Sequence, residues 1–152
     1  EISCSLVGSE MCIRDSYTGA VKNIGIGLAS PDSKAAVHEP GYQRTEAFFT
    51  NLADAAKGIK ARMGRKMIAI SILSNIHAEP FGGAAPKTAN LGIVGSLDPV
   101  AADQAACDLI WQLPSHTAQR QSIGQKIDSG WLQLEKLAAV SAGSRIYRRT
   151  VV

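Results

Sequence analysis

The sequence predicts an α/β fold with a mainly parallel sheet flanked by helices. Two short runs, Lys66–Ile76 and Leu91–Leu97, are apolar and rich in β-branched residues, as expected of strands buried on both faces. Stretches with apolar residues at helical spacing lie on either side of this pair of runs. Because strands and helices that alternate along a chain are typical of parallel sheets, these observations together favour that class.

The first 16 residues do not resemble the rest. The six residues MCIRDS (Met11–Ser16) are what the adapter-like string ATG TGT ATA AGA GAC AG encodes, so this stretch resembles translated sequencing-adapter sequence. A signal peptide is the alternative, but the chain begins with Glu1 and lacks an apolar run of sufficient length. We expect residues 1–16 to be an adapter-derived artefact and residues 17–152 to form a single domain.

The elements of that domain follow in order. Tyr17–Ser30 is glycine-rich and apolar, although its Gly-Ile-Gly lacks the rest of a dinucleotide-binding motif. Thr45 is the predicted cap of a helix that ends at Gly64. The strand Lys66–Ile76, a loop dense in glycine and proline, and the strand Leu91–Leu97 come next.

The second half is predicted to be mostly helical. Asp98 followed by proline is a strong helix start, and that helix runs to about Leu113. Two more helices are expected near Thr117–Ile127 and Trp131–Ala142. The closing run SRIYRRTVV alternates sufficiently between polar and apolar residues to predict a final edge strand.

Composition excludes several classes of protein. The chain has 16 basic and 13 acidic residues, and without residues 1–16 the numbers are 15 and 10, a mild excess that is spread along the chain. Aromatic residues make up only 5%, so a nucleic-acid partner is not expected. No apolar run approaches the roughly 20 residues that cross a bilayer, so no membrane is expected either. Cys107 is the one cysteine outside residues 1–16, which predicts a reducing, cytoplasmic location.

Five segments carry a resemblance to a known family. They are GAVKNIGIGLAS, LADAAKGI, ILSNI, LGIVGSLDPVAADQAACDLI and GSRIYRR. Their order and spacing resemble the domain of unknown function 362 family, whose members are often described as iron–sulfur-centre or ferredoxin-like proteins. The resemblance covers residues 17–152 and implies the C-terminal half of the family's domain, so the sheet is expected to be truncated at its N-terminal side. It also implies a ferredoxin-type electron-transfer domain or a small-molecule ligand as partner.

The resemblance points to a metal site that this chain has altered. Members commonly carry an acidic, cysteine-containing run after the ILSNI segment, whereas here the run is HAEPF, without a thiol. Since an iron–sulfur cluster generally needs four thiolates, no cluster is expected from this chain alone. His77 and Glu79 are two residues apart and would share one side of an extended strand. Imidazole and carboxylate suit a divalent metal such as Zn, Fe or Mn.

Asp103 is the third predicted metal ligand. It lies in a largely apolar helix, with Cys107 one turn further on the same face. Burial of a carboxylate there is energetically acceptable if it interacts with a helix dipole, a lysine or a metal. Because ligands gather at the carboxyl ends of parallel strands, His77, Glu79, Asp98 and Asp103 could converge on one site.

Four more residues are candidates for a ligand site, each with a structural alternative. Lys22 and Asn23 follow a glycine in an apolar segment, where the lysine could hold an anion or simply extend to solvent. His38 stands where the family also tends to have histidine, and its alternative is a surface or hydrogen-bonded role. For Asp98 the alternative is helix capping alone. No catalytic residue is assigned. Two hypotheses stay open: a metal- or redox-associated protein, and a non-enzymatic binding or structural module without a metal.

Overall fold

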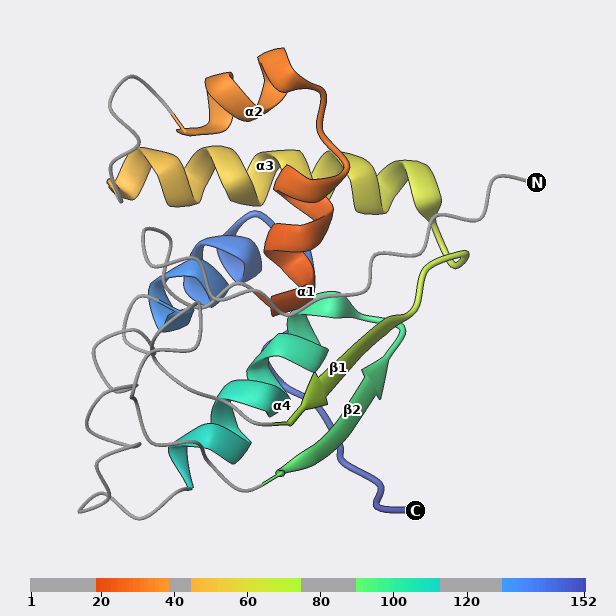
Figure 1. The fold of residues 1–152 in the computed structure, drawn as a ribbon. Coiled ribbons are helices and arrows are strands. Elements are labelled where there is room, and N and C mark those ends of the chain that lie inside the picture. The colour runs from red at the N-terminus through yellow and green to blue at the C-terminus, as the bar shows by residue number, and fades with distance from the viewer. Residues whose placement is uncertain (1–18, 39–44, 75–89, 113–129) are drawn as a thin grey trace.

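The computed structural model describes residues 19–38, 45–74, 90–112 and 130–152 (Figure 1). A short helix α1 (Gly19–Lys22) continues into a π-helical turn η1 (Asn23–Gly27). Helices α2 (Pro31–His38) and α3 (Glu46–Met63) follow, and then strands β1 (Ala69–Leu73) and β2 (Gly92–Ser96). Helix α4 (Pro99–Trp111) comes next, and residues 130–139 form a further helix before an irregular C-terminal segment.

The sheet contradicts the prediction of a mainly parallel sheet. Within the described residues it has two strands, which are antiparallel, with Ala69 opposite Ser96 and Leu73 opposite Gly92. A parallel pair needs a crossover connection that is usually a helix, and the sequence between these strands has no helical pattern. The strands are also covered on one face only, since Ile70 and Ile72 are exposed. The alternation of strands with helices was therefore the wrong basis for the prediction.

The ends of α3 and α4 confirm the predicted caps. Thr45 Oγ1 accepts a hydrogen bond from Phe48 N at 3.0 Å, and Gly64 ends α3 with φ of 58°. Asp98 Oδ1 accepts one from Val100 N at 3.0 Å, and a proline occupies the first turn of α4. These local patterns were sufficient because a capping side chain contacts backbone only two or three residues away.

The C-terminal part agrees less well with prediction. The helix over residues 130–139 ends earlier than Trp131–Ala142 suggests, and Ser141 follows it with φ of 58°. Residues 143–152 form no strand, so the predicted edge strand is wrong. The helix predicted near Thr117–Ile127 lies outside the described residues, as do residues 1–16.

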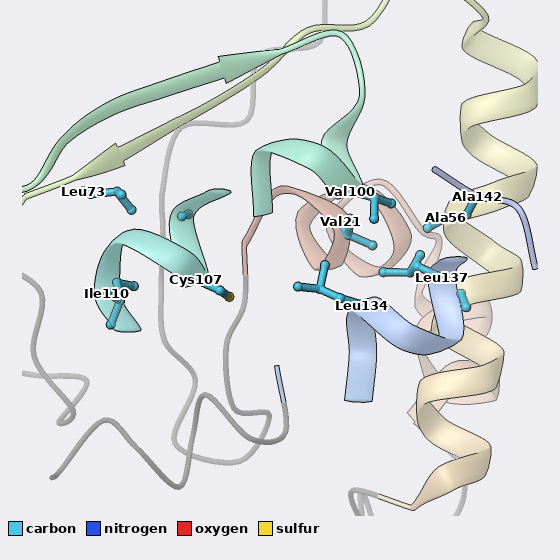
Figure 2. Close-up of a cluster of buried hydrophobic side chains, with 11 residues drawn as sticks. Val21, Ala56, Leu73, Val100, Cys107, Ile110, Leu134, Leu137 and Ala142 are labelled. Atoms are coloured by element: carbon cyan, nitrogen blue, oxygen red, sulfur yellow. The ribbon is translucent and has the colours of Figure 1, made fainter. Parts of the chain in front are cut away.

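Helix α4 contributes more side chains to the main hydrophobic core than any other described element (Figure 2). Its alanines are small enough to let α1 and the sheet pack closely against it. The helix over residues 130–139 adds Leu134 and Leu137, and the core also contains side chains from α1, α3, β1 and α4, among them Val21, Ala56, Leu73, Val100, Cys107 and Ile110. A second cluster joins α2 to α3 through Val37, Phe48, Phe49 and Leu52. Among the described helices, none combines the length and apolar character that crossing a membrane requires.

Candidate functional site

Asp103 is fully buried and accepts hydrogen bonds from the backbone of α1. Its Oδ1 accepts from Ala20 N at 2.7 Å, and its Oδ2 accepts from Val21 N at 2.9 Å. The first N–H groups of a helix have no partner within the helix, and a carboxylate is a favourable acceptor for them. Asp103 thus caps a helix that precedes it by more than 80 residues in the chain.

Asp98 joins three parts of the chain. Its Oδ1 caps α4 and also accepts a hydrogen bond from Lys60 Nζ of α3 at 3.1 Å. Its Oδ2 accepts from Ser144 N at 2.8 Å, and Lys60 Nζ also donates to the carbonyl oxygen of Ala142 at 2.7 Å. The sequence prediction that Asp98 caps the helix is confirmed, but the ties to α3 and to the C-terminal segment were not foreseen.

Gly143 makes this junction possible. A Cβ added to Gly143 would overlap Asp98 Oδ1 and would lie 2.6 Å from Cγ2 and 2.7 Å from Cβ of Val100. Only a residue without a side chain lets the backbone approach the first turn of α4 so closely. The glycine therefore has a packing role at this position.

A polar network ties the C-terminal segment to α4 beyond that junction. Arg145 Nε donates to Gln104 Oε1 at 2.8 Å, and Gln104 Nε2 donates to Asp108 Oδ1 at 3.0 Å. Tyr147 Oη donates to Asp108 Oδ2 at 2.6 Å. Burial, and then the hydrogen bond to Asp108, raise the pKa of Tyr147 to about 12. The run GSRIYRR, most of which was predicted to form an edge strand, is thus the segment that attaches to α4.

Cys107 is buried one turn after Asp103. Burial raises the pKa of its thiol well above the usual value, and the charge of Asp103 adds to that effect. A thiol that binds metal or acts as a nucleophile does so as the thiolate, which a raised pKa disfavours. The position of Cys107 fits a role in the hydrophobic core.

The remaining predicted site residues are spread over the fold. Lys22 is buried at the end of α1, and Asn23 begins η1. His38 lies at the end of α2, where its Nδ1 is 2.8 Å from the carbonyl oxygen of Lys34 and its ring packs against Phe48. His77 and Glu79 lie outside the described residues, so their predicted convergence with Asp103 stays a prediction. In the described ranges, no group of three or more His, Cys, Asp or Glu side chains could hold a metal ion.

Comparison with known proteins gives one family. Residues 13–108, well over half of the chain, match the model of the family described as Domain of unknown function (DUF362). This match confirms the resemblance predicted from the sequence motifs. No curated protein and no solved structure matches the chain.

Proposed function

The chain belongs to the DUF362 family, and we propose that it acts there as a non-enzymatic binding or assembly module. The observation that carries this proposal is the use of both α4 acids to build the fold. Asp103 satisfies the backbone of α1, and Asp98 connects α4, α3 and the C-terminal segment. These contacts stabilise the fold, so the presence of Asp98 and Asp103 is explained without assigning either residue to a reaction.

The charge on Asp103 is well placed for a structural role. Each carboxylate oxygen accepts one short hydrogen bond from a backbone N–H group, and hydrogen bonds to a charged acceptor are stronger than neutral ones. A metal that drew Asp103 away from α1 would leave the N–H groups of Ala20 and Val21 without this acceptor, at a cost of about 1–3 kcal/mol each. This cost favours the capping role over ligation.

The competing hypothesis is a metal- or redox-associated protein with His77, Glu79 and Asp103 as ligands and a ferredoxin-type partner. It rests on the family resemblance and on the spacing of His77 and Glu79. Our proposal keeps the cytoplasmic location that the cysteine content predicts, but it assigns these three residues no shared ion.

Metal analysis of the full chain separates the two hypotheses. Protein purified without chelators is measured by inductively coupled plasma mass spectrometry, beside His77→Ala and the matched variant His38→Ala. We expect all three to contain the same small, substoichiometric amounts of Zn, Fe and Mn. One equivalent of metal that is retained in His38→Ala and lost in His77→Ala would refute the proposed function.

A further inference from the structure

The outer face of the β1–β2 sheet is apolar, and no described element covers it. Helix α4 packs against one face, and Figure 1 shows α4 and α1 on the same side of the two strands. On the other face, Ile70 and Ile72 of β1 and Ile93 of β2 are 54–70% exposed. Ile68 and Leu97, one residue beyond the strand ends, are exposed to a similar degree. We call this surface the outer sheet face, defined by Ile68, Ile70, Ile72, Ile93, Gly95 and Leu97.

The register shows that these side chains form one continuous surface. Ile70 is opposite Gly95, and Ile72 is opposite Ile93. Opposed residues in an antiparallel pair point to the same face, and continuing the register sets Ile68 opposite Leu97. The outer sheet face is therefore two adjacent columns with an aliphatic residue or glycine at every position.

The outer sheet face lacks the polar residues that are expected on a solvated face. Sheets with one solvated face place apolar residues toward the core and polar residues toward water. Here the inward positions include Leu73 and Val94, but the outward positions also carry large aliphatic side chains rather than polar ones. A face with this pattern is expected to be covered by a partner.

We propose that the partner is a second copy of this chain, packed face to face on the outer sheet face about a twofold axis. This inference deepens the proposed assembly role. In a twofold interface, residues near the axis meet their own copies, so a charge there would face a like charge, and no position on the outer sheet face is charged.

The shape of the outer sheet face also suits a symmetric pair. Gly95 leaves a gap in its column: a Cβ placed there would have its nearest neighbour, the carbonyl oxygen of Ala69, at 4.0 Å. In a twofold arrangement, Ile70 of each copy can enter the Gly95 gap of the other, with the sheets about 10 Å apart.

The size of the face sets the expected strength. Five aliphatic side chains that are mostly exposed amount to several hundred Å², near the largest patches of monomeric proteins and below the roughly 800 Å² per partner of a standard stable interface. We therefore expect weak dimers, with a dissociation constant of about 10–100 μM.

Sedimentation velocity of the full chain, from about 1 to about 500 μM, tests the proposal. We expect a reversible monomer–dimer equilibrium that Ile70→Thr and Ile93→Thr each weaken about tenfold. The matched control is Ile146→Thr, the same substitution at an exposed position of the C-terminal segment, and it should leave the equilibrium unchanged. Far-ultraviolet circular dichroism of each variant verifies that it is folded.

Gly95→Val distinguishes specific packing from general stickiness. The added side chain fits the monomer but fills the gap, so dimers should weaken although the apolar area grows. Stronger association of this variant, open-ended aggregation, or a dimer insensitive to Ile70→Thr would refute the proposal. A wild-type monomer at every concentration would also refute it and would indicate that another molecule or another part of the chain covers the face. These outcomes do not depend on metal content, so either proposal can fail without the other.

Discussion

Replacing Gly143 by alanine should destabilise the fold by about 3 kcal/mol. The new methyl group would lie 2.6–2.7 Å from Val100 and would overlap the Asp98 carboxylate. Val100 is buried at the start of α4 and cannot move freely, so either Asp98 or the C-terminal segment must shift. Overpacking typically costs about 1–3 kcal/mol, and loss of a helix cap adds about 1 kcal/mol.

Thermal and urea unfolding of the full chain measure this effect. For a chain of this length, 3 kcal/mol corresponds to a decrease in Tm of about 6–12 °C. Gly58→Ala is the matched control, because Gly58 lies within α3 and an added Cβ there would meet nothing within 4 Å apart from its chain neighbours and the backbone of its own helix. That variant should be more stable by about 0.5–1 kcal/mol, since alanine is favoured in helices. If Gly143→Ala unfolds at the wild-type Tm, the C-terminal segment does not lie against Asp98 and the reasoning is wrong.

Three further predictions concern α4 and its neighbours. Asp103→Ala should lower the free energy of unfolding by about 3 kcal/mol and Asp103→Asn by about half as much, because the amide keeps one of two acceptors; urea titration measures both. The raised pKa of Tyr147 favours its protonated form in the folded state, so its stabilising effect should be complete below about pH 10 and lost as pH rises toward 12. In Tyr147→Phe this loss of stability at alkaline pH should be smaller, as measured by Tm at a series of pH values. A Tm profile that matches the wild type would contradict the contact of Tyr147 with Asp108. Alkylation of Cys107 at pH 8, followed by peptide-resolved mass spectrometry, should be slow until urea unfolds the chain, whereas rapid native labelling would show an accessible thiol.

Local patterns in the sequence predicted α3 and α4 correctly, whereas α1, η1 and α2 were not predicted. Thr45, Gly64 and the Asp98–Pro99 pair act within a few residues, so their roles can be read from the sequence alone. The same holds for the two β-branched runs, whose centres are the observed strands. The direction of pairing depends on the path between strands, which the composition of each strand does not encode.

The sequence limited the role of Asp103 to a few alternatives but could not decide among them. A carboxylate in an apolar helix predicts a dipole, a lysine or a metal as partner, and the sequence contains candidates for each. The observed acceptor role depends on the packing of α1 against α4, a contact between distant parts of the chain. Gly25 is similar: a Cβ there would lie 2.6 Å from Leu52 Cδ1, so this glycine lets η1 approach α3 and requires no nucleotide.

The polar and apolar residues of this fold point to the same kind of role. The acids that suggested chemistry lie inside or at junctions, where they satisfy backbone N–H groups and a lysine. Aliphatic side chains that could serve recognition are exposed on the outer sheet face. A sheet of two strands is marginally stable by itself, and α4 supports it on one face only. Covering the other face would both stabilise the strands and remove apolar surface from water, so assembly and stability are expected to be linked in this protein.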